Sequence, residues 1–424
     1  MWKVARRIAY MTILFCLIST VGASNQISIN LNEAIFKTIK DNPELVSFGY
    51  QVQAQEGLLQ QARLSSNPEL SIEFENFLGT GDFNGVDALE TTISIGWVLE
   101  HTVLKQRINA AQASVSSFYT QAKIAQMDAA SETARRYLEC LSNQERLMLA
   151  NQSLELAENS VLTINKRVSI SKAPAAELAR AKADLAVKKL AYEDIQHDIS
   201  VSYRKLAAQW GEINPRFNYV LGSLYTLPKL ASFESLKQRI EQNPEYDQLL
   251  SQRRMNEAEL RLAEAMSKPQ WQISTGVRRF EEQDDYALVV DFTVPLNFNN
   301  RNQGSIAAKN ASLAKIDADQ KLTTVRLNTQ LYELYEELQQ SLRRINAYKN
   351  EIIPKVTQAL QDSQKAYEKG RYSYLELQAV QASLLNAKKE YLDAMIHAHL
   401  YVIEIERITG VQISGISETN RSTS

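Results

Sequence analysis

Apolar residues recur at alternating spacings of three and four along several long segments of the chain. The last segment runs from Leu377 to Ile408, with Val380, Leu384, Ala387, Tyr391, Ala394, Ala398, Tyr401 and Ile405 between them. Chain breakers are scarce in such regions: between Trp97 and Trp210 there is no glycine and a single proline, Pro174. This spacing is the period of a coiled coil and predicts long paired helices. A compact bundle of broken helices is the alternative, which the scarcity of internal caps disfavours.

Two shorter regions have a period of two residues instead. Apolar and polar side chains alternate in 70–75 and 92–99, and again in 271–278 and 288–294. Each pair of segments predicts a β-hairpin, one over 70–99 and one over 271–296. Strands of about ten residues with one apolar and one polar face are typical of outer-membrane proteins, although a soluble hairpin packed on helices has the same alternation.

The chain contains an internal duplication. An offset of 201 residues aligns Asn42-Pro43-Glu44 with Asn243-Pro244-Glu245, and an offset of 199 relates the regions near Leu178 and Leu377. The repeated unit is a short helix, a hairpin, a long helix, a turn and a second long helix. We predict four parts of the chain: a signal peptide 1–23, a first repeat 24–224, a second repeat 225–416 and a disordered tail 417–424.

The first residues have the pattern of an export signal. Lys3, Arg6 and Arg7 precede an apolar run over 8–18, which is followed by a cleavage site of small residues, Val21-Gly22-Ala23. We expect cleavage after Ala23 rather than a membrane anchor, because a spanning helix needs about 20 apolar residues. Cleavage removes three basic and no acidic residues and changes the formal net charge from −2 to −5. The balanced charge of the full sequence, which has no basic excess, argues against a nucleic-acid partner.

The four predicted strands constrain how the chain can meet a membrane. No other uninterrupted apolar stretch of about 18 residues follows the signal, so a membrane-spanning mature chain must use strands of a closed barrel. Closure needs about eight strands, so several chains must share one barrel. The predicted fold is mainly α with a small β part, an internal two-fold repeat, and long coiled-coil hairpins that form an α-barrel. Each chain then contributes four strands to a shared transmembrane β-barrel, with loops 78–89 and 281–285 outside and the helices in the periplasm.

The turns between the long helices carry their own signals. Gly370 can adopt the left-handed conformation that ends a helix, and Ser373 with Glu376 predicts a capping box that starts the next. In the first repeat, Pro174 suits the first turn of the returning helix, and Gly410 is expected to end the last helix. Two helical hairpins therefore point away from the strands.

Several stretches together resemble one protein family over essentially the whole mature chain. They are Asn42-Pro43-Glu44-Leu45, the run 295–304, Ile353-Pro354 leading into 367–377, and the closing segment 401–410. These residues resemble the TolC-like outer-membrane efflux channels. Arg301-Asn302-Gln303-Gly304 and Glu90-Thr91-Thr92 look most like the heavy-metal (CzcC-like) branch, whereas 100–107 departs from its Gly-Gly-Lys-Arg-like turn.

The resemblance implies an assembly and its partners. It implies a homotrimer with a twelve-stranded barrel in outer-membrane lipid and a helical tunnel across the periplasm. The far tips of the helices would meet a periplasmic adaptor (membrane fusion) protein and, through it, an inner-membrane transporter of the RND type.

The sequence contains no set of residues with the spacing of a catalytic or metal-binding site. The four histidines are scattered; His397 and His399 project about 200° apart on a helix and cannot chelate one ion, so surface or packing roles are expected. After removal of the signal only Cys140 remains, which excludes an intrachain disulfide and favours a packed thiol. No phosphate loop, nucleophile elbow or two-cysteine metal knuckle is present, so we predict no enzyme, no cofactor and no resident metal.

The candidate functional residues lie at the two ends of the predicted molecule. Candidates for lining the pore are Glu73, Glu75, Asp291 and Arg278, on the polar faces of the strands, where acidic groups favour cations and Arg278 opposes them. The alternative is that they are ordinary solvated strand faces. Candidates for the periplasmic aperture and adaptor contact are Lys172, Ala173, Pro174, Gly370, Arg371, Tyr372 and Ser373, which are otherwise ordinary turn residues.

The sequence therefore predicts a passive outer-membrane duct of a tripartite efflux system in a Gram-negative bacterium. Heavy-metal cations are the first expectation for its cargo, with drug efflux or type I protein secretion as the alternatives. A periplasmic coiled-coil scaffold without a pore is the alternative of a different class.

Overall fold

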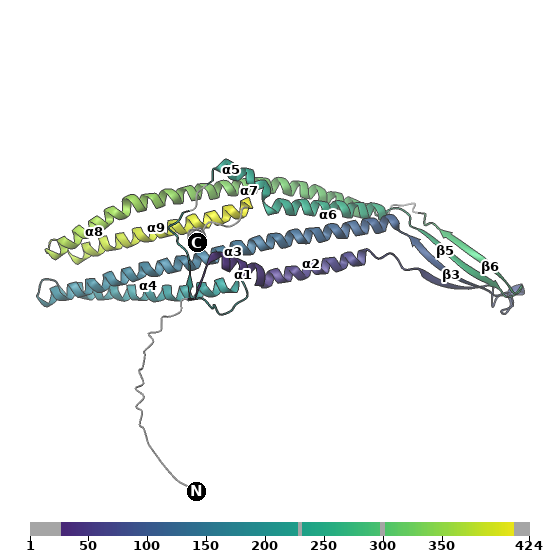
Figure 1. The fold of residues 1–424 in the computed structure, drawn as a ribbon, viewed down its shortest axis with the longest axis horizontal. Coiled ribbons are helices and arrows are strands. Elements are labelled where there is room, and N and C mark those ends of the chain that lie inside the picture. The colour runs from purple at the N-terminus through teal and green to yellow at the C-terminus, as the bar shows by residue number, and fades with distance from the viewer. Residues whose placement is uncertain (1–26, 228–230, 297–301, 411–424) are drawn as a thin grey trace, which may run out of the picture.

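The computed structural model is elongated and describes residues 27–227, 231–296 and 302–410. Long helices run from the tips at one end to a four-stranded sheet at the other (Figure 1). The short elements over residues 28–41, 219–220 and 233–242 lie near mid-length, and we call them the belt. The predicted signal peptide 1–23, the predicted tail 417–424 and residues 297–301 of the run 295–304 lie outside the described residues. Among the described helices, none combines the length and apolar character needed to span a bilayer.

The helices confirm the long coiled-coil segments predicted from the heptad spacing. The longest, α3, has 69 residues, about 100 Å at 1.5 Å per residue. The helices that run to and from the tips are α3 (His101–Ser169), α4 (Ala175–Ala208), α7 (Gln303–Ala347), its continuation α8 (Ile353–Glu368) and α9 (Tyr374–Thr409). The other helices are α1 (Leu31–Asp41), α2 (Pro43–Ala62), α5 (Phe233–Arg239) and α6 (Pro244–Met266). A π-helical turn, Tyr348–Ile352, separates α7 from α8 just before Pro354, whose ring and missing N–H disrupt regular helical hydrogen bonding.

Both predicted hairpins are present and join into one antiparallel sheet. Its strands are β2 (Glu69–Glu75), β3 (Glu90–Leu99), β5 (Trp271–Phe280) and β6 (Asp285–Thr293), in the order β2-β3-β5-β6. The β3–β5 pair joins the two repeats, while β2 and β6 form the edges of the sheet. A second, parallel pair, β1 (Ser28–Ile29) with β4 (Tyr219–Val220), lies in the belt.

The duplicated Asn-Pro-Glu motif has the same structural role in both repeats. Asn42 caps α2 by accepting a hydrogen bond from Glu44 N at 2.8 Å, and its side-chain amide donates to the carbonyl of Gln209 at 2.7 Å. Asn243 caps α6 through Glu245 N at 2.7 Å and donates to the carbonyl of Ile408 at 2.7 Å. Each asparagine therefore starts one helix and ties it to the end of the helix that returns from the tip.

Two left-handed glycines complete these junctions. Gly211 has φ +79° and Gly410 has φ +67°, and a Cβ on Gly410 would lie 2.8 Å from the carbonyl oxygen of Gln242. Gly410 ends α9 as predicted from the sequence.

The main core lies in the belt, where α1, α3, α4, α7 and α9 meet the small parallel pair. The Tyr137 hydroxyl is buried there and donates to the carbonyls of Ile29 and Leu221, and its burial raises its pKa. His399 is also buried; its Nε2–H faces the Leu224 carbonyl at 3.0 Å, and burial lowers its pKa. Burial likewise raises the pKa of the Cys140 thiol to about 12. The packing roles predicted for His399 and Cys140 are confirmed.

We predict that Asn243→Ala destabilises the folded chain by about 2 kcal/mol, because it removes both the helix cap and the buried hydrogen bond to Ile408. Asn243→Ser keeps a capping oxygen but cannot reach Ile408, so its loss should be about 1 kcal/mol. Thermal unfolding of the detergent-solubilised chain would measure the order wild type, serine, alanine. The exposed Asn109→Ala on α3 serves as the control and should leave the midpoint unchanged. Equal midpoints for all four proteins would contradict the role given to Asn243.

Candidate functional site

The two faces of the sheet differ sharply in chemistry. Pairing places Leu70, Ile72 and Phe74 on the same face as Ile93, Ile95, Trp97, Trp271, Ile273, Val277, Leu288, Val290 and Phe292. Most of these apolar side chains are exposed in the chain, Leu288 to 83% and Leu70 to 70%. An exposed apolar face of this extent marks a surface that contacts lipid or protein.

The other face carries acidic residues and one arginine. All four sequence-predicted pore residues lie on it, with Glu73 and Glu75 in β2, Arg278 in β5 and Asp291 in β6. Asp291 accepts a hydrogen bond from the Ser274 hydroxyl at 3.2 Å. The structure therefore places the predicted acids on one face, but at opposite edges of the sheet.

Arg278 does not stand alone on this face. Its guanidinium lies 2.7 Å from a Glu75 carboxylate oxygen and 2.9 Å from one of Glu90, and its Nε–H donates to the Thr92 hydroxyl at 2.8 Å. The charge of Arg278 is thus compensated by two carboxylates on two neighbouring strands, which leaves the group with a net charge of about −1. Glu90 was not among the predicted pore residues, although its alternation with Thr92 indicates the same face.

The turns at the helical tips repeat the same backbone motif. Ser171 and Gly370 have φ of +57° and +74°, and the following residues Lys172 and Arg371 donate backbone hydrogen bonds to the carbonyls of Arg167 and Ala366. These are Schellman turns, so the predicted left-handed Gly370 is confirmed and Ser171 is its counterpart.

The starts of the returning helices differ between the repeats. Ser373 and Glu376 form the predicted capping box. Two charge-assisted contacts from Ser373 hold the Glu376 carboxylate and lower its pKa. The prediction that Pro174 lies in the first turn of α4 is wrong. Pro174 occupies the N-cap position before Ala175, with an extended ψ of 147°. Its fixed φ suits that position equally, because the N-cap residue contributes no helical N–H. Ala173 and Tyr372 stand next to these caps in the two turns.

Arg167 joins the two tips, and no sequence signal predicted it. Its Nη1–H donates to the carbonyls of Tyr367 at 2.6 Å and Glu368 at 3.3 Å, and the guanidinium lies 4.5 Å from the centre of the Tyr367 ring. A cation at the C-terminus of α8 satisfies carbonyls that have no helical partner and is favoured by the helix dipole. Beside it, Ile164, Ala181, Tyr367, Tyr374 and Leu377 form a small separate core.

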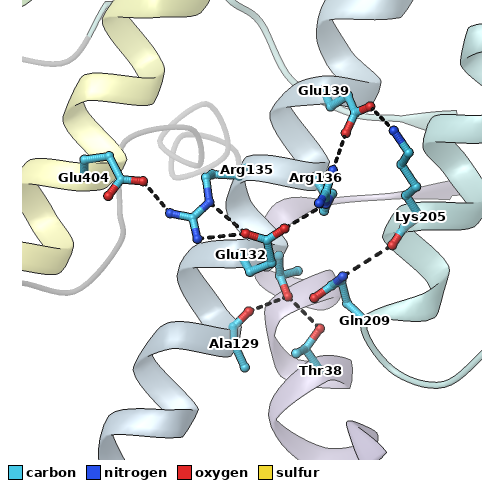
Figure 2. Close-up of polar contacts among 10 residues, drawn as sticks. Thr38, Ala129, Glu132, Arg135, Arg136, Glu139, Lys205, Gln209 and Glu404 are labelled. Carbon is cyan, nitrogen blue, oxygen red and sulfur yellow. Dashed lines mark hydrogen bonds and ion pairs between the residues drawn. The ribbon is translucent and has the colours of Figure 1, made fainter. Parts of the chain in front are cut away.

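From the belt towards the tips, α3 and α9 are linked by polar pairs that we call the α3–α9 seam. Figure 2 shows Arg135 of α3 between Glu132 on its own helix and Glu404 of α9. The further links are Asp128 with Arg407 at 2.8 Å, Arg146 with Asp393 at 3.1 Å, Gln152 with Lys388 at 2.9 Å and Ser160 with Gln381 at 3.4 Å. The ion pairs of the seam are partly exposed, so each contributes only about 0–1 kcal/mol.

A metal centre was not predicted from the sequence, and the described residues contain no group of three His, Cys, Asp or Glu side chains that could hold an ion.

Comparison with solved structures defines the class of fold. A structure of CusC, from work on transmembrane channel formation, superposes with a TM-score of 0.74 at 16% identity and covers 91% of this chain and 93% of its own. The outer membrane protein VceC of Vibrio cholerae gives 0.71 at 16% identity, covering 91% and 97%. The outer-membrane channel OprN gives 0.70 at 15%, covering 90% of each chain. The chain therefore has the fold of the TolC-like outer-membrane channels, as its sequence resemblance indicates.

The sequence also has a named relative over most of its length. The cobalt-zinc-cadmium resistance protein CzcC of Cupriavidus metallidurans is 23% identical over 384 residues, which are 90% of this chain and 90% of that protein. No protein-family model matches the chain. The resemblance to the heavy-metal branch is thus supported by a relative aligned along nearly the whole chain.

We predict that Arg167→Gln loosens the contact between the two tips, because it removes the cation from the end of α8 and from the Tyr367 ring. Amide hydrogen exchange in 366–376 should become faster by about tenfold or more, since a charged hydrogen bond to backbone contributes about 1.5–3 kcal/mol. The adjacent exposed Lys166→Gln is the matched control and should leave exchange there unchanged. Equal exchange in both variants would contradict the role of Arg167.

Proposed function

We propose that the chain is the outer-membrane channel of a tripartite efflux system and that heavy-metal cations are its cargo. The observation that carries the proposal is a four-stranded sheet with one exposed apolar face, one acidic face and two open edges, at the end of helices long enough to cross a wide aqueous space. The name of CzcC, which describes resistance to cobalt, zinc and cadmium, supports the choice of cargo.

The proposed channel is a homotrimer in the outer membrane. Four strands cannot close a barrel, whereas three copies supply twelve strands and leave no edge in lipid. The apolar face would then contact lipid and the acidic face would line an aqueous pore, with the helices in the periplasm. Transport is passive in this proposal, and the channel is not an enzyme. The proteins that the chain resembles are named as an outer-membrane channel, an outer membrane protein and a metal-resistance protein.

The tips are the proposed contact with the periplasmic adaptor, which would link the channel to an inner-membrane RND transporter. Both tips present a basic residue directly after the left-handed turn position, Lys172 in one and Arg371 in the other. Exposed Lys166 and Lys369 add to this charge. A partner surface with acidic or carbonyl groups would fit these tips.

Deletion of the gene tests the proposed cargo. We predict that the deletion strain becomes more sensitive to cobalt, zinc and cadmium salts and that a plasmid carrying the gene restores growth. Minimal inhibitory concentrations of the salts, measured beside a panel of organic drugs, distinguish the cargo classes. Sensitivity confined to the drugs would overturn the metal assignment while leaving the channel proposal in place.

Neutralising the acidic face tests the proposed pore lining. We predict that Glu73→Gln with Glu75→Gln lowers the preference for cations, because two carboxylates per chain lose their charge while Arg278 remains. The shift in reversal potential in a planar bilayer under a salt gradient is the measurement. Glu234→Gln, on the short belt helix α5, is the control and should leave the potential unchanged. An unaltered potential in the double variant would remove both residues from the pore wall.

A further inference from the structure

The edges of the sheet are left open by the fold of one chain. Within the described residues β2 and β6 each have a single neighbouring strand, whereas β3 and β5 have two. We propose that the β3–β5 contact inside the chain is the template for the contact between copies. In this assembly β6 of one copy pairs antiparallel with β2 of the next, and Thr293 lies opposite Glu75 of the next copy. The inference deepens the proposed assembly and rests on it, but it does not depend on the cargo.

The strand registers define which residues of the two repeats are equivalent. Ile72 in β2 pairs with Ile93, and Ile273 in β5 pairs with Phe292. Ile273 follows Ile72 by 201 residues and Phe292 follows Ile93 by 199. The same two offsets relate Asn42 to Asn243 and Gln209 to Ile408, which form the equivalent junctions described above. The repeats therefore share one internal geometry.

Applying these equivalences to the register of β3 with β5 gives the register that we propose between β6 of one copy and β2 of the next. Across β3 and β5, Ser94 lies opposite Gly276. The equivalent of Ser94 is Thr293 and the equivalent of Gly276 is Glu75. The pairs that follow along the edge are Val294 with Phe74, Pro295 with Glu73 and Leu296 with Ile72.

The two faces of the sheet provide an independent check of this register. Val294 and Leu296 continue the apolar alternation of β6 and would lie opposite Phe74 and Ile72, which belong to the apolar face of β2. A shift of one residue would place Leu296 opposite Glu73 and reverse the faces at every position. The transferred register keeps both the apolar face and the acidic face continuous from one copy to the next.

The neighbours of the helices lead to the same contact. Helix α6 packs between α3 and α7. Among the described elements its equivalent α2 packs along α3, the equivalent of α7, and otherwise contacts the short helix α1 that precedes it. The missing neighbour of α2 is the equivalent of α3, which is α7 of another copy. Ser251 on α6 is accordingly 3% exposed, whereas its equivalent on α2, Tyr50, is 66% exposed.

The contact completes the acidic site. In one chain Asp291 lies at one edge of the sheet, and Glu73 and Glu75 lie at the other. In the assembly Asp291 lies two residues from Thr293 on the same face, which places its Cα within about 8 Å of that of Glu75 in the next copy. The candidate pore residues from opposite edges of the sheet therefore meet only when two copies are joined.

Cysteine pairs test the register in a Cys140→Ala background. Thr293→Cys combined with Glu75→Cys places two Cβ atoms at cross-strand distance, and the purified detergent complex is oxidised with copper phenanthroline. We expect covalent species up to three chains on a non-reducing gel, which disappear on reduction. Each single variant should give none of this ladder. The matched controls are Thr293→Cys with Phe74→Cys, on opposite faces, and Thr293→Cys with Glu73→Cys, two positions away; both should give a several-fold smaller covalent fraction.

A second pair protects the test against a misfolded variant. Val294→Cys with Phe74→Cys probes the same register on the apolar face and should also cross-link. Native mass spectrometry of the unoxidised wild type separates the two possible failures. A trimer in which only the shifted pairs cross-link would overturn the register and leave the proposed channel intact. A monomeric wild type would overturn the proposed assembly and, with it, this inference.

Discussion

The structure depends on one constraint: the backbone groups at a sheet edge must find partners, and they cannot find them in lipid. In the described part of the chain, the four-stranded sheet has two open edges and an exposed apolar face, a combination that an isolated molecule in water would not stabilise. Lipid on the apolar face removes the exposure of its side chains but makes the open edges more costly. Only further strands satisfy both requirements, so the assembly that we propose follows from hydrogen-bond requirements more than from the attraction between any two side chains.

Duplication explains how a single sequence can supply both the internal contact and the contact between copies. The asparagine junctions show that the two repeats kept the details of their geometry: Asn42 and Asn243 form the same cap and the same bond to the returning helix. The sequence diverged where the environments differ. Gly276 faces Ser94 so closely that an added Cβ would lie 2.4 Å from the Ile93 carbonyl, whereas its equivalent, Glu75, lies at an edge and pairs with Arg278.

Periodicity predicted the elements of this fold, because heptad spacing and strict alternation each extend over many residues here. Local turn chemistry was also readable: Gly370, Gly410 and the Ser373–Glu376 box depend only on neighbouring residues. Pro174 was misplaced by one position, since proline fits both the N-cap and the first turn of a helix. The contacts of Arg167 and Arg278 were not predictable in the same way. Arg167 and Tyr367 are 200 residues apart, and only the packing of two hairpins brings them together.

The distribution of apolar contacts along the molecule indicates where it can change shape most easily. The belt holds a continuous core in which Tyr137, His399 and Cys140 are all buried, and this core ties α3 and α9 to the small parallel strands. Nearer the tips the same two helices are joined by the polar pairs Arg146–Asp393, Gln152–Lys388 and Ser160–Gln381, and at the tips by the small core beside Arg167. Polar links in water are exchanged at little cost, whereas opening the belt would expose apolar surface at about 25 cal/mol per Å². Separating α3 from α9 near the tips therefore costs less free energy than opening the belt, at the end of the molecule proposed to meet a partner.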